Sequence, residues 1–200
     1  MARRMTDNGR RAGSLTTGLG IGIVAGLLGA VAMGMYAMIA HLTYKGAGFF
    51  TPLYHIAATF TDPKSMEVSM QEAMAGRDFY FDAGPAMLGL AVHMMTGAAW
   101  GALFSVLALG LTRLGAVVAG VVYGAGVLVV MSFVVLPVVA DLFGGGPPIS
   151  DMAEMSGWGT FTVEHLIFGL VAGLVVAAWP RPATAEPETF TREEPQRVGG

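Results

Sequence analysis

Two histidines, His93 and His165, stand near the start of long apolar stretches of the sequence. Small residues follow each of them at every fourth position, namely Gly97, Gly101 and Ser105 after the first and Gly169, Gly173 and Ala177 after the second. Ionisable side chains inside a membrane span are energetically expensive and are therefore candidates for a functional role. Histidine in such a place can bridge helices by hydrogen bonds, ligate a metal or carry a proton.

Three kinds of site are compatible with this pattern, beside plain helix packing. Glycine four residues after a histidine leaves room for a flat ring, so His93 and His165 could be the axial ligands of a b-type haem. Copper is the second candidate, because Cu(I) accepts histidine and methionine and the first two apolar stretches contain Met33, Met35, Met38, Met94 and Met95. Methionine also fills irregular gaps in a core. The third candidate is a proton or solute site in which Glu164, adjacent to His165, and His41 take part.

Other chemistries lack support in the sequence. The chain contains no cysteine, which excludes disulfides and thiolate metal sites. Ser132 has no evident base, and no phosphate loop, nucleotide fingerprint or zinc motif is present. The basic residues do not cluster beyond a short N-terminal group, so nucleic-acid binding is not indicated. We therefore expect a protein that is not an enzyme.

The elements that carry these residues are predicted to be membrane-spanning helices. Of the 200 residues, 54% are hydrophobic and only 12% are charged, whereas soluble domains contain about 25% charged residues. Crossing the hydrocarbon core takes about 20 apolar residues. Four stretches meet this length, at residues 15–43, 85–109, 114–139 and 159–179. They predict an all-α, polytopic membrane protein with a four-helix bundle at residues 15–180.

Arginine and lysine placement predicts the orientation of the bundle. Four arginines precede the first span, Arg113 lies between the second and third, and further arginines follow the fourth, whereas residues 140–158 contain no arginine or lysine. By the positive-inside rule, both termini are cytoplasmic and the loops at 44–84 and 140–158 are external. Residues 1–14 form a basic cytoplasmic segment, expected to be disordered or to lie on lipid headgroups, and residues 181–200 a disordered cytoplasmic tail. His93 and His165 would then lie at the same depth, roughly 10–12 Å below the external boundary.

Small residues at spacing four predict how the spans pack. Lipid provides no hydrophobic drive for association, so membrane helices approach closely over small residues. Each span has such a stripe, centred on Gly22 and Gly26, Gly97 and Gly101, Gly120 and Gly124, and Gly169 and Gly173. The spans also read as two tandem hairpins related by an axis along the membrane normal, which would bring His93 and His165 together. The stripe of the first span is the longest, from Gly18 to Gly34, and could leave a face for another membrane subunit or a second copy of the chain.

The long loop also contains recognisable signals. The segment "GAGFFTPLYHIAATF" is apolar and aromatic, which predicts that it lies at the membrane interface. Asp62 and Pro63 form a favourable helix start, and Met66, Met70 and Met74 follow on one face before Gly76. This pattern predicts a short amphipathic helix.

The segments "AMGMYAMIAH", "PLYHIAATF", "HMMTGAAWGALF", "GVVYGAGVLVVMSFVVLPVV" and "EHLIFGLVAGLV" together resemble small bacterial four-helix inner-membrane proteins of unknown function, and more loosely the YagU-like proteins. The resemblance covers roughly residues 15–180. It implies a multi-pass protein of the bacterial plasma membrane and transfers no catalytic residue. A structural or accessory subunit, or a homo-oligomer, is the function that this reading favours. A haem, copper or transport site at His93 and His165 is the alternative.

Overall fold

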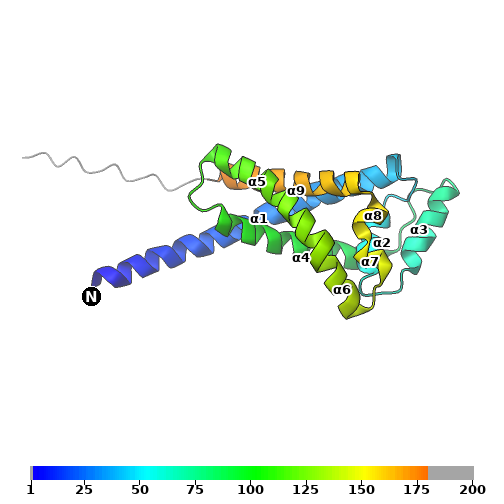
Figure 1. The fold of residues 1–200 in the computed structure, drawn as a ribbon, viewed down its shortest axis with the longest axis horizontal. Helices are drawn as coiled ribbons and strands as arrows, with labels where there is room; N and C mark the ends of the chain where they lie inside the picture. The colour runs from blue at the N-terminus through cyan, green and yellow to red at the C-terminus, as the bar shows by residue number, and fades with distance from the viewer. Residues whose placement is uncertain (1, 180–200) are drawn as a thin grey trace, which may run out of the picture.

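The computed structural model describes residues 2–179, with side chains from residue 16 onward, and all regular structure in this range is helical. Four helices are long and apolar enough to cross a membrane, which confirms the predicted spans (Figure 1). They are α1 (Ala2–Thr43), α4 (Ala83–Leu107), α5 (Arg113–Val130) continued by the π-helix η1 (Met131–Val135) and α6 (Leu136–Phe143), and α9 (Trp158–Ala178). The tail predicted at residues 181–200 lies outside the described residues.

Helix α1 begins much earlier than the first predicted span. Its backbone is helical from Ala2, so the described residues 2–14 differ from the disordered alternative. The other alternative, that this basic segment lies on lipid headgroups, stays a prediction. Figure 1 shows this first part of α1 extending beyond the other spans. The apolar portion still starts where expected, because the candidate span covers Thr16–Thr43.

Glycine residues of the four spans lie in two close helix–helix interfaces. In the α1–α4 interface, a Cβ atom added to Gly26 would collide with the Gly97 carbonyl oxygen, and one added to Gly101 would collide with the Gly22 carbonyl oxygen. In the α5–α9 interface, Gly120 and Gly169 stand in the same relation to each other's carbonyl oxygens. Any side chain at these positions would hold the backbones apart, which is why the sequence has glycine there.

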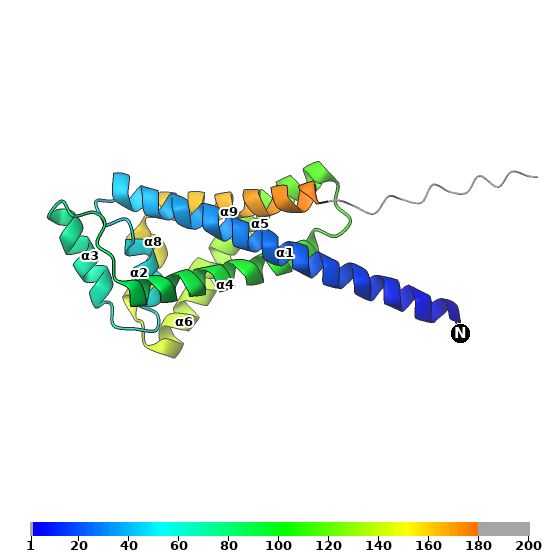
Figure 2. The ribbon, with the colours of Figure 1, turned by 180° about the vertical axis from the view of Figure 1, so that it is seen from behind.

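The two hairpins are present, but the symmetry predicted for them is broken. Helix α1 packs against both α4 and α9, and Phe168 of α9 covers Gly29 (Figure 2). Under a twofold relation between the hairpins, α4 would pack against α5 as closely as α1 packs against α9. Instead α4 and α5 barely touch, since α5 runs obliquely to the other spans (Figure 1). The bundle is therefore tight on one side and loose on the other.

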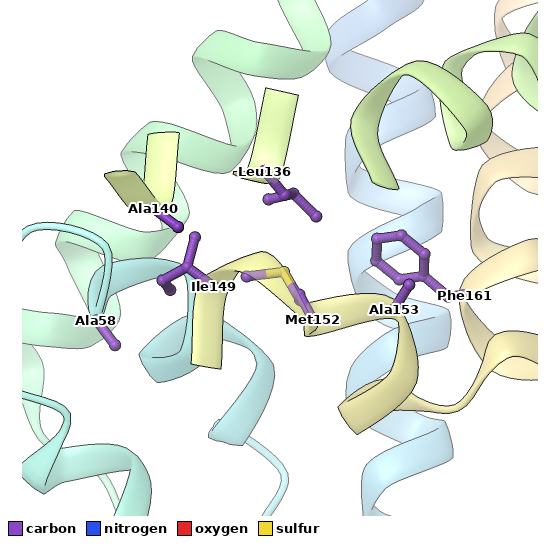
Figure 3. Packing of buried hydrophobic residues seen from close by; sticks show 7 residues of the cluster. All are labelled: Ala58, Leu136, Ala140, Ile149, Met152, Ala153 and Phe161. Carbon is purple, nitrogen blue, oxygen red and sulfur yellow. The ribbon is translucent and has the colours of Figure 1, made fainter. Parts of the chain in front are cut away.

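Four short helices cover one end of the bundle, which we call the loop end. They are α2 (Thr51–Ala57), α3 (Lys64–Met74), α7 (Pro147–Ser150) and α8 (Met152–Ser156). A buried apolar cluster joins α2, α6, α7, α8 and α9 there, with Ile149 at its centre (Figure 3). Gly144 and Gly146 have positive φ angles of 71° and 60°, which lets the chain turn sharply from α6 into α7.

Helix α2 is largely buried in the protein, and the location of its segment at the membrane interface stays a prediction. Tyr54 is only 1% exposed. Its hydroxyl donates to the Tyr80 carbonyl oxygen at 3.1 Å and accepts from the Asp82 N–H at 2.8 Å. A Cβ atom on Gly89 of α4 would collide with the Leu53 carbonyl oxygen. Tyr54 therefore ties α2 to the segment just before α4, and the close approach at Gly89 packs α2 against α4 itself.

The predicted amphipathic helix is confirmed as α3. The Asp62 carboxylate accepts a hydrogen bond from the Lys64 N–H at 2.9 Å, and Gly76 follows the helix with φ +76°. Its methionine face is only partly used, because Met66 is buried against α2 while Met74 is 77% exposed.

The opposite end of the bundle, where α4 turns into α5, is closed. Ala25, Phe104, Ala108 and Ala172 form a buried cluster that joins α1, α4 and α9. The Thr112 hydroxyl caps α5 by accepting from the Gly115 N–H at 3.0 Å. We call this end of the bundle, where α4 turns into α5, the turn end.

Candidate ligand-binding cavity

A cavity of about 280 Å³ lies within the half of the bundle nearest the loop end. Its walls come from α1, α2, α4, α9 and the continuous α5–η1–α6 helix, and they are mostly apolar. Five ionisable side chains also line it: His41, His55, His93, Glu164 and His165. This is the part of the described structure where the sequence-predicted candidates meet.

The sequence predicted some of these positions and not others. His93 and His165 line one cavity, as their matched depth suggested, and His41 joins them from α1. Glu164 was expected to point away from His165, yet it also lines the cavity. Both are buried because α9 is enclosed on several sides. His55 was not a candidate, because its segment was assigned to the membrane interface.

Two of the imidazoles are held by carbonyl groups of their own helices. The Nδ1 atom of His41 donates to the Ala37 carbonyl oxygen at 2.9 Å, and Nδ1 of His165 donates to the Phe161 carbonyl oxygen at 2.8 Å. A carbonyl oxygen only accepts, so these Nδ1 atoms carry the proton. In the neutral ring Nε2 is then a bare acceptor, and it has no hydrogen-bond partner among the described residues.

The other two imidazoles connect different elements. Nε2 of His93 on α4 donates to the Ala30 carbonyl oxygen of α1 at 2.9 Å. Nε2 of His55 on α2 donates to the Pro148 carbonyl oxygen of α7. By the same reasoning, Nδ1 is the bare acceptor in each neutral ring.

His55 lies outside the spans, and its surroundings favour the neutral ring. Burial lowers the pKa of His55 below its ordinary value, the hydrogen bond to Pro148 opposes this, and the nearby His41 lowers the pKa further. Near neutral pH the His55 side chain in the cavity wall is therefore uncharged and can accept a hydrogen bond.

Glu164 is the least satisfied polar group of the site. Its side chain is 5% exposed, and its Oε1 atom is buried without a hydrogen-bond partner among the described residues. Leaving a buried polar atom unpaired costs about 1–3 kcal/mol, and more for a charged group. Such an atom in a cavity wall indicates a place where a partner can be accommodated.

A chain of hydroxyl groups extends from the loop end toward this carboxylate. The Tyr36 and Tyr44 hydroxyls are 3.0 Å apart, and Tyr44 lies 3.3 Å from the Thr160 hydroxyl. Thr160 precedes Glu164 by four residues on α9, so the two share a helix face. The sequence pattern of Thr160 four residues before Glu164 was visible, but its tyrosine partners on and after α1 were not.

The described residues do not form a ready metal centre. No group of three or more histidine, aspartate or glutamate side chains among residues 16–179 is placed to hold one ion. Of the methionines that suggested copper, Met33 lines the cavity, whereas Met95 is 72% exposed on the outer face of α4. A copper site that combines histidine with methionine stays a prediction from the sequence.

The space required for a haem ring beside the two histidines is also largely occupied. Gly97, four residues after His93, faces the Ala30 side chain, and Gly169, four residues after His165, faces the backbone of Gly120 and Gly124. These glycines bring helices together and do not open a slot. The residues present do not fit a haem between His93 and His165.

The cavity does not continue to the turn end. Its lining stops at Ala30 on α1, Trp100 on α4, Val127 on α5 and Phe168 on α9. Beyond these residues the glycine interfaces and the Phe104 cluster fill the bundle. Among the described residues the site is a blind pocket and not a channel.

No family model, curated protein or solved structure matches the chain. Fold and site by themselves define the class: a multi-pass, all-helical membrane protein with a histidine-lined cavity in one half of its bundle.

Proposed function

We propose that this chain is a non-enzymatic integral membrane protein of the bacterial plasma membrane that binds a small molecule in the histidine-lined cavity. The observation that carries the proposal is an apolar cavity of about 280 Å³ lined by Glu164, whose buried Oε1 atom has no hydrogen-bond partner among the described residues. Binding sites for small molecules have this character, with apolar walls and a few convergent polar groups.

Binding is favoured over catalysis and over transport. The Ser132 hydroxyl is buried without a hydrogen-bond partner among the described residues, and Ser132 does not line the cavity. The blind end of the cavity supports binding without passage across the bundle. In the proposed orientation both termini are cytoplasmic, so the loop end and the cavity face the external side.

The native tryptophans offer a test of binding. Trp100 lines the cavity, whereas Trp158 and Trp179 lie elsewhere and are 46% and 40% exposed. A Trp158→Phe, Trp179→Phe protein retains Trp100 as its single tryptophan. In lipid nanodiscs, 4-bromoanisole, a small heavy-atom quencher, is expected to quench Trp100 with a saturable concentration dependence.

A matched control separates binding from partition into lipid. A Trp100→Phe, Trp179→Phe protein reports from Trp158 at the loop end, and its quenching is expected to rise without saturation. If Trp100 behaves like Trp158 with every small probe, the binding proposal fails. The accessory-subunit hypothesis would then be preferred, and co-purification of a partner in mild detergent would test it.

Because the chain contains no cysteine, the proposed orientation can be tested by labelling single introduced cysteines. Single cysteines at Asp151 between α7 and α8, and at Gly110 in the α4–α5 turn, have no native thiol to compete with them. A membrane-impermeant maleimide added to intact cells is expected to label D151C and not G110C. The opposite labelling would reverse the orientation and place the cavity on the cytoplasmic side.

A further inference from the structure

The ionisable side chains of the cavity offer a ligand mainly acceptors, and this restricts the ligand. Resting on the binding function proposed above, we infer that the ligand has a small apolar body and a hydrogen-bond-donating head, a hydroxyl or a protonated amine, held by Glu164. The inference names the chemical class of molecule that the site selects.

Each neutral imidazole has one N–H, and in this structure a backbone carbonyl already receives it. His41 and His165 donate within their own helices, and His93 and His55 donate across elements. What the four rings can still offer a ligand is therefore lone pairs. The unpartnered Oε1 atom of Glu164 is a further acceptor.

An acceptor-rich apolar pocket discriminates strongly between ligands. A molecule with a donor satisfies the buried carboxylate oxygen, while a molecule without one leaves it unpaired. A ligand whose head only accepts would place lone pairs against lone pairs. The remaining walls, including Val127, Leu136 and Phe168, suit an apolar body.

An organic donor fits the site better than a bare metal ion. Divalent metals need several ligands converging within about 2–2.5 Å. No three histidine or acidic side chains of the described residues converge in this way. A hydroxyl or ammonium head needs only one or two acceptors, which Glu164 and a neighbouring imidazole can provide.

The test compares two quenchers that differ in the donor. In the single-Trp100 protein, 4-bromophenol is expected to bind about tenfold or more tightly than 4-bromoanisole, whose oxygen carries a methyl group. Glu164→Met replaces the acceptor with an apolar side chain of similar length. In this variant the ratio of the 4-bromoanisole Kd to the 4-bromophenol Kd is expected to fall to near one. Glu154→Gln, a change at an exposed carboxylate on α8, should leave the ratio unchanged.

Further arms define the head and guard against misfolding. 4-Bromobenzylamine tests the protonated amine, and tighter binding than 4-bromophenol would assign an ammonium head. Glu164→Gln keeps a carbonyl acceptor without charge and is expected to give an intermediate ratio if Glu164→Met does not fold. Saturable quenching with equal Kd values for phenol, amine and anisole would overturn the inference while leaving the binding function in place. The absence of saturable quenching by all three would refute the binding function itself.

Discussion

Replacing Gly26 by alanine is expected to weaken the bundle although it adds a single methyl group. Gly26 lies in the α1–α4 interface, where the new Cβ atom would overlap the Gly97 carbonyl oxygen and come within 2.9 Å of the Gly101 α-carbon. Ordinary van der Waals separation begins near 3.4 Å. All of these neighbouring atoms belong to the backbone, so no flexible side chain can move aside.

The size of the effect follows from the required displacement. Restoring an ordinary separation from the Gly101 α-carbon takes about 0.5 Å, and clearing the Gly97 carbonyl oxygen takes more. A gap of 0.5–1 Å forfeits about a quarter to a half of the van der Waals attraction between each pair of atoms that is separated. Overpacking in tight cores typically costs about 1–3 kcal/mol. We expect a loss of about 2 kcal/mol in the free energy of unfolding, because α1 can separate from α4 only as a rigid helix.

Gly20 provides the control on the same helix. It has open space on the side where a Cβ atom would be added, so Gly20→Ala adds a methyl group without a collision and gains up to about 1 kcal/mol in helix propensity. Reversible unfolding in mixed micelles of increasing denaturing-detergent fraction, followed by circular dichroism, measures both variants. If Gly26→Ala is as stable as Gly20→Ala, the interpretation of the glycine stripe as a steric requirement is refuted.

Three further predictions concern the loop end. Tyr54→Phe leaves the partly buried Asp82 N–H without its acceptor and is expected to lower the free energy of unfolding by about 1 kcal/mol in the same detergent titration. Asp62→Ala removes the acceptor of the Lys64 N–H and is expected to destabilise the start of α3 by about 1 kcal/mol, seen as faster amide hydrogen exchange in that helix. Burial lowers the pKa of His55, so below about pH 6.5 the unfolded chain binds more protons than the folded chain. The free energy of unfolding therefore decreases as the pH is lowered through this range, by at most about 1.4 kcal/mol per pH unit.

Each of these has a matched comparison. Tyr80→Phe removes a hydroxyl for which no hydrogen bond is described, and an equal loss in Tyr80→Phe and Tyr54→Phe would contradict the assigned role of Tyr54. Asp78→Ala removes a carboxylate outside α3 and should leave exchange in α3 unchanged. His55→Gln retains a donor for Pro148 but cannot titrate, so the pH slope of stability should be shallower than in the wild type. Parallel slopes would show that His55 does not contribute.

The spans and their close interfaces could be predicted because each depends on local sequence. Length and apolarity define a span, and small residues at every fourth position mark a face on which backbones meet. Gly26 against Gly97 and Gly120 against Gly169 are both consequences of this pattern. The equal depth of His93 and His165 in the bundle could be predicted for the same reason.

The features of the fold that the sequence does not predict depend on packing between segments that are distant in the chain. The apolar and aromatic pattern around Tyr54 does not predict that its side chain is buried and hydrogen-bonded to Tyr80 and Asp82, because these partners lie 26 and 28 residues later in the chain. The stripe from Gly18 to Gly34 was expected to leave a face for a partner helix. The stripe itself is occupied within the bundle, because Gly18, Gly22, Gly26 and Gly34 all face α4 or the residues just after it. A partner on another face of α1 stays a prediction.

The oblique course of α5 is the other feature that local pattern could not reveal. The π-helix η1 precedes Pro137, which has no N–H to donate, and both lie where the helix passes the cavity. The N–H of Leu136 bonds to the Met131 carbonyl oxygen five residues earlier. Proline in a membrane helix predicts a local adjustment, but not its direction.

The loose packing between α4 and α5 has a thermodynamic consequence for any occupant of the cavity. Both helices contribute to the cavity wall, and they have few contacts with each other. If this side of the bundle faces the hydrocarbon of a bilayer, the cavity can be reached from the lipid. A molecule would then be sampled at its concentration in the lipid, which exceeds its aqueous concentration by the partition coefficient. A site with only modest intrinsic affinity could thus be filled at low aqueous concentration, and its selectivity would combine the membrane's preference for the apolar body with the protein's preference for the head.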